Sequence, residues 1–211
     1  MNPGDRTFQQ LRGQKHTPMG PGPGGTGSAS ASGNRRYLKY VILAITVFLL
    51  YLLGDYMWRE MRWRFIVVHH TAGDSGNMEY YRALHKKKHG WPDIAYHFLI
   101  NNGSMNTSIG QIEVSSLWEK RTLNYSTRIS YINYLGIAVA LVGNFDKHDV
   151  HPLQYEALIN LLTNLSMKYN IPPERIVGHG ELQNTHCPGT HLNMSKVRAD
   201  VAAAINRRRE Q

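Results

Sequence analysis

The longest apolar pattern in the chain runs from Leu38 to Tyr56, and only Lys39 and Asp55, near its ends, carry charge. At about 1.5 Å per residue, a helix of this length just crosses a bilayer core of about 30 Å. The alternatives are a buried helix and a cleaved signal peptide. A signal peptide usually has a short basic lead and a cleavage site of small residues, whereas this lead is long and the exit reads Gly54-Asp55-Tyr56-Met57-Trp58. We therefore predict a retained transmembrane helix over residues 37–56.

Beyond this span, short apolar runs alternate with helical patterns. The unbroken apolar run over residues 136–142 is typical of a central strand buried on both faces. Asn102-Gly103 indicates a hairpin turn, and residues 113–132 show no clear pattern. Alternating strands and helices predict an α/β domain with a mixed central β-sheet flanked by helices. Strands are expected over residues 64–69, 95–101, 105–112 and 136–142 and from Ile176 into His179, and helices over residues 78–88, 152–169 and 195–207.

The remaining segments complete the domain organisation. Residues 1–36 are rich in Gly, Pro and Ser and are expected to be a disordered tail. Basic residues outnumber acidic ones before the span, which places the tail in the cytoplasm and the following domain outside. Arg59, Arg62 and Arg64 on the outer side weaken this contrast. We expect a juxtamembrane linker over residues 57–62, a globular domain over 63–207 and a C-terminal tail over 208–211.

The formal net charge is +9 and the isoelectric point is about 9.7. The basic residues are dispersed, with clusters at 86–88 and 207–209, and no aromatic and basic stripe indicates nucleic-acid binding. Solvated surface is the simplest interpretation, and weak attraction to anionic wall polymers or lipid headgroups is the functional one. The single cysteine excludes an internal disulfide. We expect a monomer.

That cysteine, Cys187, stands eight positions after His179, which follows a short apolar run. Imidazole and thiolate are preferred zinc ligands, and a catalytic zinc needs three protein ligands and one open position. His69, at the end of another predicted strand, is the best third candidate. The neighbouring His70 is expected to point to the opposite side of that strand. The alternative is a buried free thiol and a surface imidazole with no common role.

The wider pattern favours the zinc site. The segments V-H-H-T-A at 68–72, G-W-P-D-I-A-Y-H-F at 90–98, L-V-G-N-F at 141–145 and G-H-x(7)-C-P-G at 178–189 occur in this order. Over residues 63–205 the chain resembles the zinc N-acetylmuramoyl-L-alanine amidases, in particular the phage lysozyme-type amidase and the animal peptidoglycan recognition proteins. The resemblance implies that His69, His179 and Cys187 bind Zn²⁺.

The same resemblance implies two catalytic residues. Tyr96 matches the family tyrosine that hydrogen-bonds the attacking water and the tetrahedral intermediate, with core packing as the alternative. Thr185 matches a position where relatives have lysine or threonine, and it is expected to support the intermediate. His97 is expected to be structural. Glu181 is either a residue that orients a ligand or a solvated loop residue.

Two departures limit the resemblance. Relatives often carry Gly-Ala-His before the Tyr-Asn that precedes the central strand, whereas residues 124–133 read N-Y-S-T-R-I-S-Y-I-N. Substrate-binding residues are therefore not predicted. Wall-recycling amidases have a glutamate in the central strand, where this chain reads Ala138-Val139-Ala140. The expected function is zinc-dependent cleavage of peptidoglycan between N-acetylmuramic acid and L-alanine, on the outer side of the cell (inner) membrane. The alternatives are a non-catalytic peptidoglycan-binding module and a phage-type lysis enzyme with a membrane segment.

Overall fold

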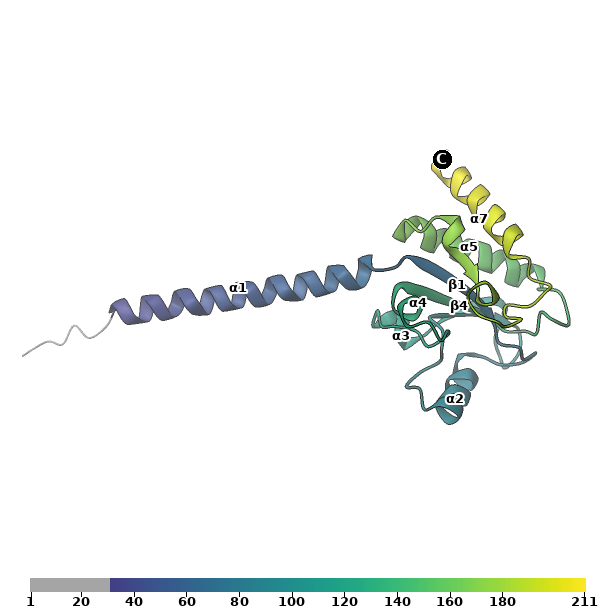
Figure 1. Ribbon diagram of the computed structural model, residues 1–211, viewed down its shortest axis with the longest axis horizontal. Helices are drawn as coiled ribbons and strands as arrows, with labels where there is room; N and C mark the ends of the chain where they lie inside the picture. The colour runs from purple at the N-terminus through teal and green to yellow at the C-terminus, as the bar shows by residue number, and fades with distance from the viewer. Residues whose placement is uncertain (1–30) are drawn as a thin grey trace, which may run out of the picture. The chain divides into compact units, whose positions relative to one another are not determined.

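The computed structural model describes residues 31–211, so most of the tail predicted over residues 1–36 lies outside the described residues. The first element is a single long helix, α1 (Ala31–Met61) (Figure 1). Its segment Arg35–Met61 is long and apolar enough to cross a membrane, and none of its apolar window is buried against protein. A soluble core helix would be buried, whereas a signal sequence would share these properties. The helix also includes all but the last residue of the predicted linker over 57–62.

The globular domain is built on a five-stranded sheet in the order β3-β2-β4-β1-β5. The central strand β4 is parallel to β1 and β2, β1 is parallel to β5, and β3 is antiparallel to β2. This arrangement confirms the predicted mixed sheet. All residues of β4 are buried, as expected for a strand covered on both faces. The strands are β1 (Phe65–His70), β2 (Phe98–Asn102), β3 (Ile109–Val114), β4 (Gly136–Leu141) and β5 (Ile176–Gly178).

Helices cover the two faces of the sheet (Figure 1). Helices α5 (Pro152–Tyr169) and α7 (Met194–Arg209) pack on the face that contains Ile66, Val68 and Val139. Helix α2 (Met78–His89) packs with Leu99 and Ala140 on the opposite face. Because side chains alternate along a strand, His69 of β1 points to the same face as α2. The short helical elements are α3 (Ser116–Glu119), α4 (Ser130–Leu135), η1 (Pro173–Arg175) and α6 (His179–Leu182).

The hairpin after β2 differs from the prediction. The expected strand over 105–112 is wrong at its start, because β3 begins only at Ile109. Met105 and Asn106 have φ values of 50° and 60°, in the left-handed region that ends strand pairing. Helix α2 is capped by the Asn77 side chain, which accepts from the Tyr80 N–H at 2.9 Å.

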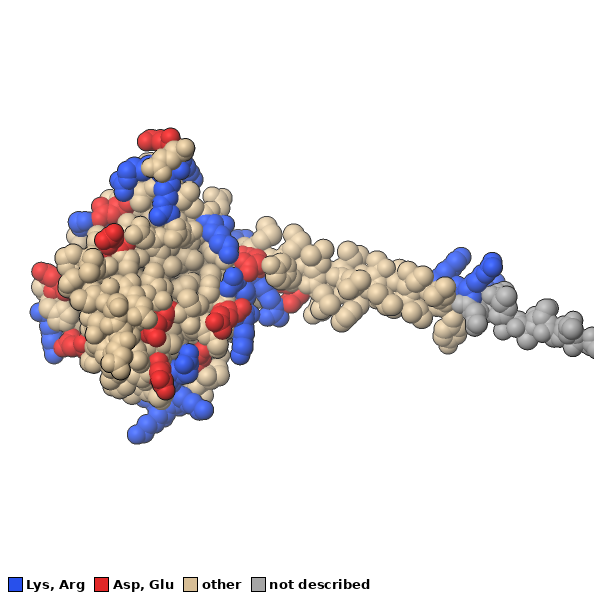
Figure 2. Space-filling model, turned by 180° about the vertical axis from the view of Figure 1, so that it is seen from behind, with Lys and Arg blue, Asp and Glu red and all other residues tan. Residues whose placement is uncertain are grey.

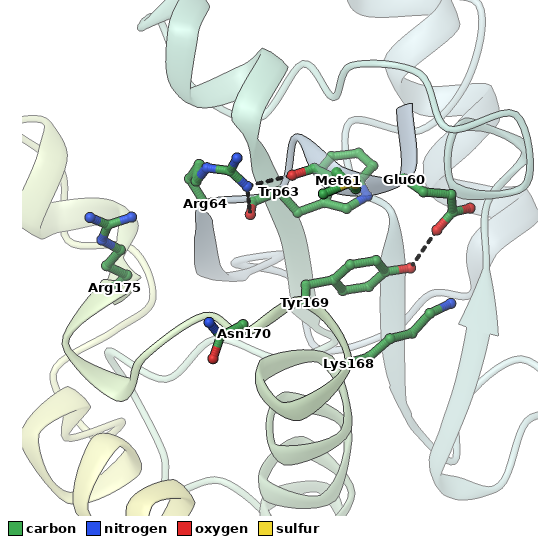
Figure 3. Close-up of a pocket in the computed structure, with 8 residues that line it drawn as sticks. All are labelled: Glu60, Met61, Trp63, Arg64, Lys168, Tyr169, Asn170 and Arg175. Carbon is green, nitrogen blue, oxygen red and sulfur yellow. Dashed lines mark hydrogen bonds between the residues drawn. The ribbon is translucent and has the colours of Figure 1, made fainter. Parts of the chain in front are cut away.

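The last turn of α1 is bound to the globular domain, within the compact unit Tyr51–Gln211. The Glu60 carboxylate lies 2.6 Å from Arg121 and accepts from the Tyr169 hydroxyl at 3.3 Å. Figure 3 shows this hydroxyl directed at Glu60, beside Trp63, which is 1% exposed. These contacts fix the residues at which α1 ends and the chain enters β1.

Candidate metal centre and active site

The two histidines predicted to bind zinc are brought together by strand pairing. Strands β1 and β5 run parallel, and Val68 pairs with Gly178. The next residues are His69, near the carboxyl end of β1, and His179, the first residue of α6. Because the carboxyl ends of parallel strands lie at the same edge of a sheet, the two imidazoles meet there. Their ring centroids are 4.7 Å apart.

A glycine-dependent loop returns Cys187 to this edge. The Gly180 N–H donates to the Cys187 carbonyl at 2.6 Å. A Cβ at Gly180 would lie 2.6 Å from the Thr185 carbonyl oxygen, so only glycine allows the loop to lie this close to α6. Gly189, with a φ of 101°, would place a Cβ 2.4 Å from the Phe145 backbone. Gly180 and Gly189 therefore allow the loop to close and to place the Cys187 thiol beside the two histidines.

The three predicted ligands form one group of donors. The donor atoms of His69, His179 and Cys187 all lie within 4.8 Å of one another. The Cys187 Sγ is 3.6 Å from the His69 Nδ1. Zinc bonds of about 2.3 Å to sulfur and 2.1 Å to nitrogen, at a tetrahedral angle, place two such ligands about 3.6 Å apart. The chain therefore presents donor types and a spacing that fit Zn²⁺.

Burial sets the charge of these groups. Burial lowers the pKa of His69 well below its usual value, so its imidazole is neutral and keeps a lone pair for a metal. Burial raises the pKa of the Cys187 thiol to about 12. The His70 N–H, 3.4 Å from Sγ, is one polar contact that favours the thiolate. A bound divalent cation supplies the charge that a buried thiolate lacks.

Tyr96 lies beside the ligand group. The structure places it just before β2, and not inside the strand predicted over 95–101. Its ring centroid is 5.1 Å from that of His69. Burial raises the pKa of the phenol, so Tyr96 presents a neutral hydroxyl that can donate a proton in a hydrogen bond.

Thr185 lies two residues before Cys187 in the same loop. Its hydroxyl oxygen accepts from the Cys187 N–H at 3.3 Å, which leaves the hydroxyl proton free to donate. Thr185 and His179 both line a cavity of about 540 Å³. His70 faces away, as predicted, and its Nδ1 accepts from the Phe145 N–H at 3.2 Å.

The chain matches the N-acetylmuramoyl-L-alanine amidase family over residues 59–190. It belongs to this family. The match confirms the resemblance inferred from the sequence motifs. Peptidoglycan-recognition protein SC1a/b of Drosophila simulans is 26% identical over 149 residues, which cover 66% of this chain and 72% of that protein. Peptidoglycan recognition protein 1 of Bos taurus is 29% identical, covering 61% of this chain and 68% of that protein.

A solved structure gives the same result for the fold. N-acetylmuramoyl-L-alanine amidase LysC from Clostridium intestinale URNW superposes with a TM-score of 0.55 and 27% identity. The aligned region covers 68% of this chain and 88% of that structure. The amidase fold therefore accounts for the globular domain, and amidase chemistry is the general activity of the family.

The structure adds a residue that sequence reasoning missed. The His179 Nε2 is 2.9 Å from the Gln183 Oε1, and an amide oxygen can only accept. This pairing suits the tautomer that carries its proton on Nε2 and keeps the Nδ1 lone pair for a metal. The i,i+4 spacing could have indicated this pair. Glu181, expected either to orient a ligand or to be a solvated loop residue, accepts from the Gly178 N–H at 2.7 Å and pairs with Arg198 at 3.0 Å, so it holds the backbone before His179.

Two further histidines hold the chain on either side of Tyr96. His97 is fully buried, its Nδ1 accepts from the Ala138 N–H at 3.1 Å, and its Nε2 lies 3.1 Å from the Thr122 carbonyl. These bonds to the central strand and a loop agree with the predicted structural role. His85, which the sequence did not single out, accepts from the Ala95 N–H at 3.0 Å and lies 5.8 Å from the Tyr96 ring. Both neighbours of Tyr96 are therefore held by imidazoles.

Proposed function

We propose that this chain is a zinc-dependent amidase that cleaves peptidoglycan between the lactyl group of N-acetylmuramic acid and L-alanine. The observation that carries this proposal is the convergence of the His69, His179 and Cys187 donors at a spacing that suits tetrahedral zinc. Membership of the amidase family supports the choice of the N-acetylmuramoyl-L-alanine bond as the one that is cleaved, and of peptidoglycan as the polymer that contains it.

The mechanism assigns a role to each group. Zinc, when bound, supplies Lewis acidity that activates water and polarises the scissile carbonyl. His69 and His179 remain neutral donors, and the pairing with Gln183 fixes which nitrogen of His179 is free. The Tyr96 hydroxyl donates to the oxygen on which negative charge develops, and the free Thr185 hydroxyl proton adds a second, weaker donor. The buried strand edge holds these groups in place before substrate arrives.

A non-catalytic peptidoglycan-binding module is the alternative from another class, because several relatives are named as recognition proteins. Cys187 favours catalysis, since a binding module has no need of a complete ligand set. We further propose that α1 is a retained anchor, with the N-terminus in the cytoplasm and the amidase domain on the wall side.

The test is zinc quantification together with muropeptide digestion by the full chain in detergent. We expect Cys187→Ala to lose zinc and activity, and Tyr96→Phe to keep zinc and lose about a hundredfold in turnover. His191→Ala removes an exposed histidine paired with Asp149 and should change neither quantity. Full activity after chelation of zinc, or in Cys187→Ala, would refute the proposal. Peptidoglycan binding without cleavage by the zinc-loaded wild type would establish the binding module.

A further inference from the structure

A cavity of about 600 Å³ lies where α1 ends and the chain enters β1 (Figure 3). Its walls come from the last turn of α1, the end of α5 and η1, which precedes β5. Its volume is within the range of about 300 to 1,000 Å³ that is typical of small-ligand sites. The cavity is remote in sequence from the predicted zinc ligands, so it is a separate candidate site.

The wall formed by α1 is fixed to the domain. The Trp58 indole N–H donates to the Tyr134 hydroxyl at 2.9 Å. The Arg62 guanidinium carbon lies 4.3 Å from the centroid of the Trp63 ring and 4.5 Å from that of Tyr134. Arg62 also donates to the Arg121 carbonyl at 2.9 Å. Because these contacts hold the last turn of α1 in place, the cavity has a defined shape.

The cavity has an excess of positive charge. Arg64, Lys168 and Arg175 line it. Glu60 is the only acidic residue among the described residues of the lining, and its carboxylate is already paired with Arg121 at 2.6 Å. Within the described chain, the side chains of Lys168 and Arg175 make no hydrogen bond and no ion pair. Two cations without a counter-ion therefore border the same cavity.

Aromatic rings orient both of these cations. The Lys168 Nζ lies 4.9 Å from the centroid of the Tyr169 ring. The Arg175 guanidinium carbon lies 5.7 Å from the centroid of the Phe65 ring. A cation beside an aromatic face is attracted by the ring and is less mobile than a free surface side chain. The two charges are thus directed by the domain.

Two more donors border the cavity. Arg64 donates to the carbonyls of Met61 and Trp63 through Nη1 alone, which leaves its other two nitrogens available. Trp63 is 1% exposed, yet its indole N–H has no acceptor among the described residues. Since buried donors are almost always hydrogen-bonded, the unpaired indole indicates that an acceptor, such as an oxygen of a bound anion, belongs to this site.

The position of the cavity along α1 indicates where the anion comes from. Glu60 and Met61 stand four and five residues beyond the span predicted over 37–56, which is about 6 to 8 Å along the helix. The polar headgroup layer on each side of a bilayer is about 5 to 8 Å deep. A cavity at this point of a spanning helix therefore faces lipid headgroups.

We propose that this cavity binds the phosphate of an anionic lipid headgroup. Arg64 and Arg175 offer planar pairs of donors to the phosphate oxygens, and Lys168 adds a point charge. The proposal rests on the part of the proposed function that takes α1 to be a retained anchor. A bound headgroup would hold the domain against the membrane surface at the base of this helix.

The test is native mass spectrometry of the full chain in an uncharged detergent, with phosphatidylglycerol, phosphatidylcholine and inorganic phosphate as the probes. The wild type should retain one phosphatidylglycerol and bind it about tenfold more tightly than phosphatidylcholine, whose headgroup has no net charge. The double variant Lys168→Ala, Arg175→Ala should lose about tenfold in affinity for phosphatidylglycerol and lose this preference. Inorganic phosphate at the same concentration should not displace the lipid.

The double variant Lys87→Ala, Lys88→Ala is the matched control, because it removes the same charge from exposed positions on α2. It should keep the wild-type affinity, and both double variants should keep the wild-type melting temperature, because all four side chains are exposed. Equal affinity for phosphatidylglycerol in the two double variants would overturn the site. Displacement by inorganic phosphate would assign the cavity to a soluble phosphate and overturn the lipid assignment.

The anchor and the amidase activity are tested by other measurements. A mature protein that lacks α1 would refute the anchor and, with it, a lipid ligand in the cell. Zinc content and muropeptide cleavage should be the same in both double variants as in the wild type, because the cavity contains no proposed ligand or catalytic residue. Failure of the lipid site is therefore distinguishable from failure of the proposed amidase function.

Discussion

At the scale of single residues, side-chain partners decide which imidazoles can serve a metal. Both ring nitrogens of His97 are hydrogen-bonded to backbone groups, those of Ala138 and Thr122. In His179, only Nε2 is hydrogen-bonded, to the Gln183 side chain, so the other ring nitrogen is available to a metal. Burial lowers the pKa of His97 to about 3 and of His85 to about 4. Both remain neutral at the pH of growth, and the structure depends on that neutrality.

His97 makes stability depend on pH. Its pKa is about 3 in the folded protein and about 6.5 when unfolded, so between these values only the unfolded chain takes up the proton. Unfolding is thereby favoured as the pH falls below 6.5, by about 2 kcal/mol at pH 5 from this residue. Denaturant titrations should show a flatter pH dependence for His97→Gln than for wild type. Equal slopes for the two proteins would contradict this assignment, since their zinc ligands are the same.

Gln183 should tune the metal site without binding the metal. Gln183→Ala removes the acceptor that fixes the His179 tautomer, and loss of such a supporting bond weakens metal affinity about tenfold to a hundredfold. Competition with a zinc chelator measures this change. Asn184→Ala, at an exposed neighbouring position, is the matched control and should keep wild-type affinity. Unchanged zinc affinity in Gln183→Ala would show that Gln183 does not support the metal site.

At the scale of elements, the site depends on how closely the Cys187 loop approaches α6. That approach is possible because Gly180 lacks a side chain, and a Cβ there meets backbone, which cannot move aside as a flexible side chain can.

Gly180→Ala should therefore displace Cys187 while every ligand residue remains in the chain. We expect zinc content to fall and the melting temperature to drop. Gly90→Ala is a useful control for fold stability, because Gly90 has a φ of 71° but an open space around its missing Cβ. It should lower the melting temperature and keep zinc. Full zinc occupancy in Gly180→Ala would show that the loop tolerates the clash.

The elements also show what the sequence could reveal. Periodic, strongly apolar segments were predictable, and α5 spans the predicted residues 152–169. The β3 start was wrong, because left-handed backbone at Met105 and Asn106 leaves no periodic signal. The three candidate ligands were predicted from their motif and residue types. The segment over 124–133 was not predicted, because the hydrogen bonds between Thr127 and Asn133 follow no periodic pattern. The Gln183 contact was missed, although its i,i+4 spacing from His179 could have indicated it.

At the scale of the whole molecule, the chain combines an apolar helix with a charged globular domain. On the face shown in Figure 2, Lys and Arg side chains on the domain are interspersed with acidic ones and form no continuous stripe. The domain could be attached to a membrane by weak electrostatic attraction or by the spanning helix, and washing conditions distinguish these two kinds of attachment.

We predict that the full chain stays with membranes through washes in high salt and at alkaline pH, because a spanning helix is held by its apolar side chains. Attachment by surface charge alone would be released by salt. The mass of the membrane-bound protein should include α1, and a shorter mature protein would show that the segment is a cleaved signal.

The central claim is that His69, His179 and Cys187 together bind one zinc ion. X-ray absorption spectroscopy at the zinc edge of the full chain tests it most directly. The account predicts one sulfur neighbour at about 2.3 Å and two imidazole nitrogens at about 2.0 to 2.1 Å. The sulfur neighbour should vanish in Cys187→Ser. A zinc shell without sulfur in the wild-type protein, or one unchanged by that substitution, would contradict the account.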